Sequence, residues 1–206
     1  QSAVTALVVN YCTYDLTRMA VWSLHGHYPE LPIHIVDNGS PDGSGAYLRQ
    51  LADSLPPVSL TQNSGNRHHG PAMDQMARQV NTPYFLTFDS DAILYRPGIV
   101  EMLYQALDKH QYAAGHQMLM DQAGFKTTDP DGIPYVHPFC ALFRTDAYQA
   151  LPPFEKHGSP CLRNEWTAQK AGWQLEACPV KAYVYHPWQG TVSQTGHQLG
   201  WRSKLR

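Results

Sequence analysis

The sequence predicts an α/β fold in which a mostly parallel central sheet is flanked by helices. Short strand-like segments alternate with amphipathic helical segments along the first half of the chain, a pattern typical of β-α-β units. The strand-like segments are apolar along their whole length, which indicates a sheet that is covered on both faces. The chain has 206 residues, a length that suits one domain, and its sequence contains no clear linker. We therefore expect a single domain over residues 1–206.

Local patterns predict four strands and four helices in the first half of the chain. Runs rich in β-branched, aromatic and other apolar residues predict strands, at residues 6–11, 33–37, 58–60 and 84–88. Apolar residues that recur every three or four positions predict helices, at residues 16–24, 46–55, 70–80 and 97–107. The last two helices begin at Pro71 and Pro97, and proline suits the first position of a helix.

The second half of the sequence is less regular. Strands are predicted by the apolar runs at residues 112–119, 136–144, 175–178 and 182–186. A helix is expected over residues 164–171, and Gly172 ends it. The span from Asp121 to Pro138 contains Gly, Pro, Asp and Thr in the proportions of a loop, and we interpret it as a mobile loop.

Composition limits the classes of function. The formal net charge is −2, and only 16% of the residues are charged, so the chain carries no excess of positive charge to attract nucleic acid. The four cysteines show no spacing typical of a zinc site or a disulfide scaffold. No apolar stretch approaches the roughly 18 residues of a membrane span. We expect a cytoplasmic protein without a transmembrane segment, with attachment to a membrane surface as an alternative.

Polar residues follow each of the first four predicted strands. They are Asn10, the pair Asp37-Asn38, the pair Gln62-Asn63 and the triplet Asp89-Ser90-Asp91. Asn and Asp also form turns and cap helices, which is the alternative explanation for any one of them. In an open α/β sheet, however, ligands bind beyond the carboxyl ends of the strands. The whole set therefore favours a binding site at this edge.

The triplet Asp89-Ser90-Asp91 carries the most specific chemistry. Alternate residues of an extended segment point the same way, so the two carboxylates are expected to converge. Two like charges at the end of an apolar strand are costly unless a cation neutralises them. Carboxylate oxygens suit Mg²⁺ or Mn²⁺, which proteins typically bind together with a phosphorylated substrate. The triplet therefore predicts a divalent metal shared with a phosphate-bearing ligand.

Two glycine-rich segments adjoin this predicted site. We interpret Gly39–Gly45 as a turn that presents Asp37, because it lacks the glycine order and the lysine of a phosphate-binding loop. In the segment Asn63–Gly70, Arg67 suits contact with a phosphate or a nucleotide. The two histidines that follow Arg67 are interpreted either as neighbours of the metal or as exposed residues.

The order and spacing of these motifs resemble the nucleotide-sugar half of family 2 glycosyltransferases, which have the GT-A fold. The resembling segments are residues 9–11, 36–40, 42–44, 63–67 and 88–91 in the first half, and 170–173 and 184–186 in the second. The resemblance covers residues 4 to about 190. It implies a nucleotide-sugar-binding half over about residues 1–110 and an acceptor-binding half over about residues 111–206.

The resemblance also implies roles for individual residues. Asp37 would hydrogen-bond the nucleobase, Asp89 would contact the ribose and the metal, and Asp91 would bind the metal directly. His186 would be a further ligand of the metal or the diphosphate. The nucleotide-sugar-binding set that the resemblance implies is Asn10, Tyr11, Asp37, Asn38, Asn66, Arg67, Asp89 and Ser90, and the metal set is Asp89, Asp91 and His186.

The catalytic base is where this sequence departs from the family pattern. Enzymes of the family carry an acidic residue near the start of the late helix, which deprotonates the acceptor hydroxyl. Counted back from Gly172, the usual acidic pair falls near Cys161, which is not acidic. Glu165 is the nearest carboxylate, and we interpret it as the base. We also interpret the segment from Gly190 to Gly200 as a lid over the diphosphate.

The resemblance implies a glycosyltransferase that depends on Mn²⁺ or Mg²⁺ and inverts the anomeric centre. The donor would be a nucleoside-diphosphate sugar, with a UDP-sugar favoured, and the acceptor a hydroxyl of a glycan, a lipid-linked molecule or a small molecule. One alternative is a non-catalytic or degenerate nucleotide-sugar-binding protein, motivated by the missing acidic pair. A second is a phosphohydrolase of the haloacid dehalogenase type, in which Asp89 and Asp91 act on phosphate.

Overall fold

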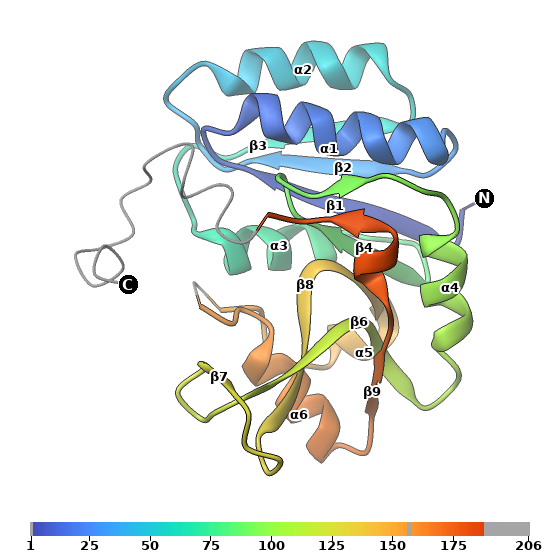
Figure 1. The fold of residues 1–206 in the computed structure, drawn as a ribbon. Helices are drawn as coiled ribbons and strands as arrows, with labels where there is room; N and C mark the ends of the chain where they lie inside the picture. The colour runs from blue at the N-terminus through green and yellow to red at the C-terminus, as the bar shows by residue number, and fades with distance from the viewer. Residues whose placement is uncertain (1, 156–157, 188–206) are drawn as a thin grey trace.

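An eight-stranded sheet forms the centre of the molecule (Figure 1). The computed structural model describes residues 2–155 and 158–187, so the segment interpreted as a lid lies outside the described residues. The strand order is β3-β2-β1-β4-β8-β6-β7, and β9 pairs with β6 outside this path. The strands are β1 (Val4–Asn10), β2 (Ile33–Asp37), β3 (Val58–Gln62), β4 (Tyr84–Phe88), β6 (Gln111–Met120), β7 (Lys126–Thr127), β8 (Ile133–Arg144) and β9 (Gln174–Ala177).

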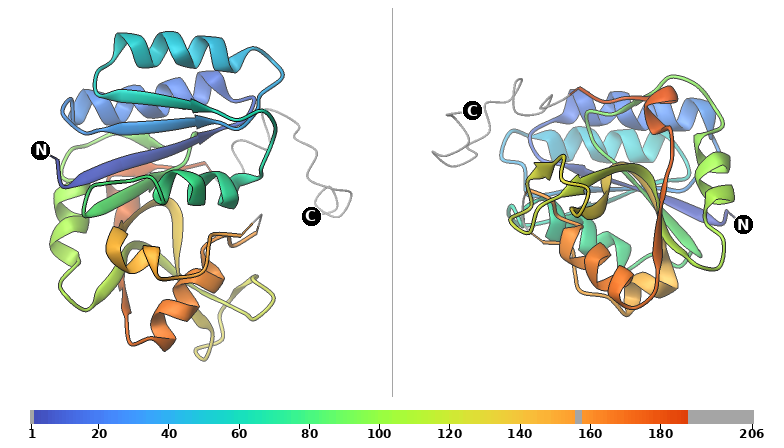
Figure 2. Two further views of the ribbon diagram at one scale, coloured as in Figure 1. Left: turned by 180° about the vertical axis from the view of Figure 1, so that it is seen from behind. Right: turned by 60° about the horizontal axis from the view of Figure 1, so that its bottom comes forward.

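Helices cover both faces of this sheet, as the views in Figures 1 and 2 show. The helices are α1 (Tyr14–His27), α2 (Ser44–Ser54), α3 (His69–Ala77), α4 (Ile99–Ala106), α5 (Thr145–Gln149), α6 (Leu162–Lys170) and the 3₁₀ turn η1 (Val180–Ala182). A separate two-stranded antiparallel sheet pairs β5 (Ile93–Leu94) with β10 (Val184–Tyr185). The prediction of an α/β fold with a mostly parallel sheet between helices is confirmed.

Two apolar cores explain why the central strands are apolar along their whole length. Val4, Ala6 and Val8 of β1 pack on one face of the sheet, in a core shared with α1, α2 and α4. Leu7 and Val9 face the opposite way, into a core shared with α3, α5 and α6. Successive side chains of a strand point to opposite faces, so a strand between two helical layers needs apolar residues at every position.

The strand directions gather the carboxyl ends of the four parallel strands β1 to β4 at one edge of the sheet. β1 pairs in parallel with β2 and β4, and β2 pairs in parallel with β3. β8 runs antiparallel to β4, with Phe88 opposite Cys140. The residues of β8 that precede Cys140 therefore lie beyond the end of β4, beside Asp89.

Several predicted boundaries in the chain are wrong. α3 ends at Ala77 rather than at residue 80, and α5 and β5 were not predicted. The span 121–138 is not one loop, because it contains β7 and the start of β8. Pairing with β6 imposes strand structure there, with Met120 opposite both Lys126 and Ile133. The predicted strand at 182–186 is reduced to β10.

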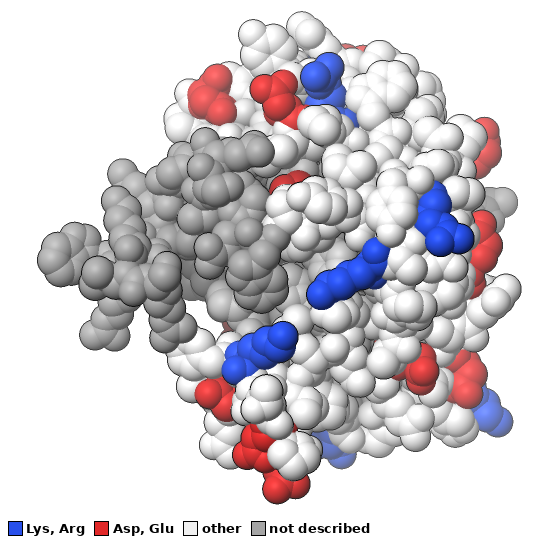
Figure 3. Space-filling view, viewed as in Figure 1, with Lys and Arg blue, Asp and Glu red and all other residues white. Residues whose placement is uncertain are grey.

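The charged residues are widely spaced on the surface. On the face shown in Figure 3, uncharged side chains cover most of the described surface, in keeping with a chain of which 16% is charged. Within residues 2–155 and 158–187, no helix has the length and apolar character needed to cross a membrane.

Candidate functional site

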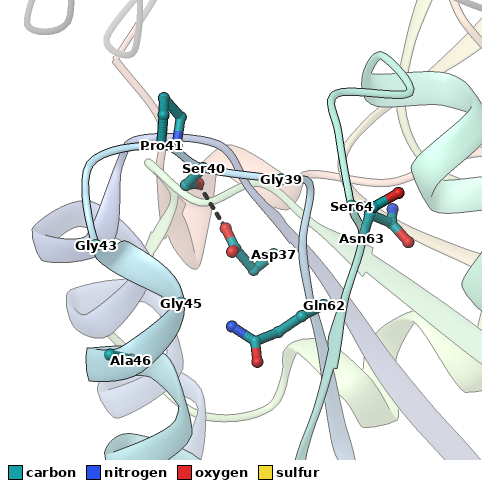
Figure 4. Close-up of a pocket in the computed structure, with 10 residues that line it drawn as sticks. All are labelled: Asp37, Gly39, Ser40, Pro41, Gly43, Gly45, Ala46, Gln62, Asn63 and Ser64. Atoms are coloured by element: carbon teal, nitrogen blue, oxygen red, sulfur yellow. Dashed lines mark hydrogen bonds between the residues drawn. The ribbon is translucent and has the colours of Figure 1, made fainter.

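Asp37 lines a pocket beyond the end of β2 (Figure 4). The residue is only 3% exposed, and its Oδ1 accepts hydrogen bonds from Asn10 Nδ2 at 2.9 Å and from Ser40 Oγ at 2.5 Å. A Cβ atom on residue 45 would lie 2.1 Å from Gln62 Nε2 and 2.8 Å from Asp37 Oδ2, so Gly45 leaves room for these two side chains. The pocket has a volume of about 450 Å³ and is lined by Asp37, Gly39, Ser40, Pro41, Gly43, Gly45, Ala46, Gln62, Asn63 and Ser64.

The turn that follows Asp37 depends on two glycines with positive φ. Gly39 has φ of +76°, and a Cβ atom on it would lie 2.4 Å from the Cα atom of Gly65. Gly43 has φ of +86°, but a Cβ atom there would meet no atom within 4 Å. The interpretation of this segment as a turn that presents Asp37 therefore agrees with its backbone, and Gly39 also allows the turn to pass directly against the loop after β3.

This pair of glycines gives a matched test of the turn. Gly43→Ala is expected to lower the free energy of unfolding by about 1–2 kcal/mol, the cost of a left-handed conformation for alanine. Gly39→Ala has the same backbone cost and also forces the loop at Gly65 to move, which adds about 1–3 kcal/mol. Urea unfolding of the two variants measures the difference, and equal losses would show that the loop moves aside without cost.

Asn10 and Asn38 hold the two loops of the site in place. Asn10 is 0% exposed, and its Oδ1 accepts a hydrogen bond from Thr17 Oγ1 at 2.8 Å while its Nδ2 holds Asp37. Asn38 is 1% exposed, donates to Asn66 Oδ1 at 3.0 Å and accepts from the Arg67 backbone N–H at 3.1 Å. Both amides are satisfied inside the protein, so they orient the loops that carry Asp37, Asn66 and Arg67.

The two carboxylates after β4 converge on His186. His186 Nε2 lies 3.1 Å from Asp91 Oδ1 and 3.3 Å from Asp89 Oδ2. One ligand atom from each of these three residues lies within 4.8 Å of the others. Two carboxylates and one imidazole at this separation form a donor set that fits a divalent cation such as Mn²⁺ or Mg²⁺. The structure thus brings together the three residues that were predicted to bind metal.

The electrostatics of this cluster follow from its close contacts. Burial by itself raises the pKa of Asp89, but hydrogen bonds with His186 and His69 outweigh it and hold that pKa well below its usual value. Burial would lower the pKa of His186, whereas its hydrogen bonds with Asp89 and Asp91 raise it to about 9. A cationic His186 therefore neutralises part of the carboxylate charge in the absence of a metal ion.

Three more side chains complete the surroundings of this cluster: His69, which the sequence indicated as a neighbour of the metal or an exposed residue, and His137 and Phe139, which it did not indicate. His69, at the start of α3, places Nε2 3.5 Å from Asp89 Oδ1. The ring of Phe139 stacks on His186 with centroids 4.7 Å apart. The ring of His137 lies 6.1 Å from that of His186, and burial lowers the pKa of His137 to about 4, so this imidazole is neutral at neutral pH. The β8 residues were missed because the pairing of β8 with β4 joins segments about fifty residues apart.

Glu165 does not lie among these groups. It is on α6, 0% exposed, and its Oε2 accepts a hydrogen bond from the Val136 backbone N–H at 2.8 Å. Burial raises the pKa of this carboxyl well above its usual value. A general base has to reach the proton that it removes, and this carboxyl has no exposed surface in the structure. This placement disagrees with the sequence-based interpretation of Glu165 as the base.

The remaining predicted residues lie on the same edge of the sheet with different exposures. Arg67 and Asn66 are exposed in the loop after β3, and Tyr11 is half-buried after β1. Ser90, between the two aspartates, is 8% exposed. Ser40 was not assigned from the sequence, although its place three residues after Asp37 in a turn is a signal that could have indicated its hydrogen bond with the carboxylate.

The chain belongs to a known family. The family model for glycosyl transferase family 2 matches residues 5–128, which include β1 to β4 and the Asp89-Ser90-Asp91 triplet. No curated protein sequence matches the chain. The resemblance noted in the sequence is therefore confirmed at the level of the family.

Solved structures agree with this assignment. The mannosyltransferase PcManGT from Pyrobaculum calidifontis, in complex with GDP-Man and Mn²⁺, superposes with a TM-score of 0.70 at 16% identity, over 86% of this chain and 55% of that one. Residues 1–349 of TarS from S. aureus, in complex with UDP-GlcNAc, superpose with a TM-score of 0.67 at 17% identity, over 91% of this chain and 59% of that one. These similarities show the GT-A fold, and this chain spans little more than half the length of either neighbour.

Proposed function

We propose that this chain transfers a sugar from a nucleoside-diphosphate sugar to a hydroxyl group of an acceptor, with the help of Mn²⁺ or Mg²⁺. The observation that carries the proposal is the position of two features on one edge of the sheet. The Asp37 pocket lies at the end of β2, and the cluster of Asp89, Asp91 and His186 adjoins the end of β4. Only β1 separates these two strands.

The distance between the two features suits such a ligand. Neighbouring strands lie about 4.8 Å apart, so β2 and β4 are about 10 Å apart. A nucleoside diphosphate spans this distance with its base in the Asp37 pocket and its phosphates at the carboxylates. The neighbours PcManGT and TarS were solved with GDP-Man and UDP-GlcNAc, which supports a nucleotide sugar as the donor.

Asp37 supplies the preference for the base in this proposal. Its Oδ1 is already engaged by Asn10 and Ser40, which leaves Oδ2, beside the side-chain amide of Gln62, as the oxygen that would accept a hydrogen bond from the base. An acceptor of this kind suits the ring N–H of uracil or guanine. We therefore propose a UDP-sugar as the favoured donor and a GDP-sugar as the next candidate, with Asn66 and Arg67, exposed in the loop after β3, as further contacts of the nucleotide.

Asp89, Asp91 and His186 would hold the metal ion. When bound, the cation would stabilise the negative charge that develops on the departing diphosphate. His69 orients Asp89 through its contact with Oδ1, and the ring of Phe139 holds the His186 imidazole by stacking. The chain's own part is thus to keep two carboxylates and one imidazole together at the end of β4.

A thermal-shift screen tests the proposal. UDP, GDP, dTDP and CDP sugars are added with Mn²⁺ or with EDTA, and a ligand at one hundred times its Kd stabilises the fold by about 2.7 kcal/mol. For a chain of this size the midpoint is expected to rise by about 5–10 °C, with Mn²⁺ only. Asp37→Ala should remove most of the shift for the preferred base, whereas a shift for every sugar in EDTA would contradict the proposal.

One observation favours a second function, nucleotide-sugar binding without transfer. Pro160 and Cys161 occupy the place where the acidic pair of the family is expected, and Glu165 is enclosed in the fold. In such a protein the donor would bind with Mn²⁺, but neither transfer to an acceptor nor hydrolysis of the donor would follow. Release of UDP or GDP from the bound sugar nucleotide distinguishes the two functions. The phosphohydrolase alternative has no comparable support, since the chain belongs to glycosyl transferase family 2.

A further inference from the structure

We propose that His137 donates a hydrogen bond to the sugar carried by the donor, and that Glu165 is the positioning residue that holds His137 for this contact. The inference rests on the proposed function and adds the sugar subsite to it. Three observations carry it: the order of the strands along the sheet, the hydrogen bond that His137 accepts, and the hydrogen bond that Glu165 accepts.

The strand order places His137 where the sugar has to lie. The strand order along the sheet is β2-β1-β4-β8. A ligand with its base in the pocket at β2 and its phosphates at the carboxylates after β4 therefore continues toward β8. The sugar is attached to the far phosphate of the nucleotide, so it extends from the carboxylates over β8. His137 is on that strand, directly opposite His116 of β6, and its ring lies 6.1 Å from the ring of His186.

The hydrogen bond that His137 accepts decides which of its nitrogens is the donor. The Phe139 backbone N–H donates to His137 Nδ1 at 3.2 Å. In a neutral imidazole, a nitrogen that accepts a hydrogen bond leaves the proton on the other one. His137 therefore carries its proton on Nε2, and this N–H suits the hydroxyl oxygens of a sugar.

Glu165 fixes the backbone immediately before His137. Gly115 pairs with Ala141 whereas the next residue, His116, pairs with His137, so β8 bulges over residues 138–140. A bulge leaves backbone groups without regular ladder partners. Oε2 of the Glu165 carboxyl group accepts the Val136 N–H at 2.8 Å at the edge of this bulge. The helix α6 thus uses a buried carboxyl to hold the strand at the residue next to His137.

The experiment compares two affinities in the same protein. The Kd of UDP-glucose or GDP-mannose, whichever binds in the screen, is measured with Mn²⁺ beside the Kd of UDP or GDP. His137→Phe keeps an aromatic ring but removes the N–H, so the nucleotide sugar is expected to bind about 3–10-fold more weakly, the loss of one hydrogen bond. The affinity for the nucleoside diphosphate should stay within about twofold. His137→Gln, which retains an N–H donor, should lose less.

Variants of Glu165 test the positioning role through the ratio of two Kd values, that of the nucleotide sugar and that of the nucleoside diphosphate. Glu165→Gln keeps an oxygen that can accept the Val136 N–H and should behave like the wild type. Glu165→Met removes that acceptor and should change the ratio as His137→Phe does. If the Met variant does not fold, the two His137 variants still decide the sugar contact, and a changed ratio in Glu165→Gln, which keeps the acceptor oxygen, would overturn the positioning role. His27→Ala, at an exposed position of α1, is the control.

The outcomes separate this proposal from the proposed function. If wild-type protein binds neither nucleotide in Mn²⁺, the proposed function fails and the sugar subsite fails with it. If the nucleotide binds but His137→Phe leaves the ratio unchanged, only the sugar subsite is overturned. The same holds if His137→Phe weakens the nucleotide and the nucleotide sugar equally.

Discussion

Replacement of Asp91 by alanine is expected to abolish metal-dependent nucleotide binding. The side chain of Asp91 is 6% exposed and its Oδ1 lies 3.1 Å from His186 Nε2, so alanine removes a central oxygen ligand and leaves one carboxylate and one imidazole. Loss of supporting residues around a metal commonly costs 10–100-fold in affinity, and loss of a direct ligand should cost at least about 100-fold. Titration calorimetry of UDP and GDP with Mn²⁺ measures the loss directly.

The matched control for this variant is Asp53→Ala, because Asp53 is exposed on α2, far along the sequence from the cluster. It should leave the nucleotide affinity and the thermal midpoint unchanged. The Asp91→Ala protein has to melt cooperatively, so that lost binding is not lost folding. Wild-type affinity of Asp91→Ala in Mn²⁺ would contradict the metal assignment, and with it the role given to the end of β4.

The first half of the fold was predictable because each element there is encoded locally. The strands β1, β2, β3 and β4 are short apolar runs between helices with clear apolar stripes, and parallel strands in β-α-β order place their carboxyl ends together. The metal cluster followed from the same logic, since Asp89 and Asp91 are alternate residues after an apolar strand. His186 came from the resemblance to the family, and the structure places it against both aspartates.

The second half was less predictable because its structure depends on distant pairing. Residues 126–127 and 133–135 have the composition of a loop, but hydrogen bonding with β6 makes them strands. The bulge at 138–140 likewise exists only in the paired sheet. His137 and Phe139 lie at this bulge, so no local pattern could place them beside His186.

Glu165 shows a signal that sequence analysis did not use. Spacing from Gly172 led to this residue, but spacing does not tell which face of a helix a side chain occupies. Cys161, at the N-cap of α6, and Glu165 and Ala168 within the helix are spaced by four and three residues, so they lie on one side of it, and all three are 0% exposed. Because Cys161 and Ala168 are apolar, this pattern places Glu165 on the buried face of the helix.

Glu165→Gln is expected to stabilise the protein increasingly as the pH rises. In the fold, burial keeps the pKa of this carboxyl well above the ordinary value of 4.5, and Oε1 has no hydrogen-bond partner within the described residues. The group is therefore protonated when folded and ionised when unfolded above about pH 4.5. Unfolding then releases a proton from this group, so the contribution of Glu165 to the free energy of unfolding falls as the pH rises, by up to about 1.4 kcal/mol per unit.

Glutamine cannot ionise, so the variant lacks this loss, while its side-chain oxygen still accepts the Val136 N–H. Between pH 5.5 and 7.5 the stability of the variant relative to the wild type should grow by up to about 2.7 kcal/mol, or about 5–11 °C in the melting midpoint. Differential scanning calorimetry over this range measures it, with Glu30→Gln at an exposed position as the control. Parallel curves for the variant and the wild type would mean that Glu165 is ionised in the fold.

The same variant separates a structural carboxyl from a catalytic one. A neutral, enclosed Glu165 predicts that Glu165→Gln keeps both donor binding and sugar transfer, since the hydrogen bond to β8 survives. A catalytic base at this position predicts intact donor binding but a loss of transfer of about 10²–10⁴-fold, the usual contribution of general base catalysis. Donor binding and transfer measured on one preparation, beside its pH-dependent melting, therefore decide whether the carboxyl acts on the acceptor or only on the strand that carries His137.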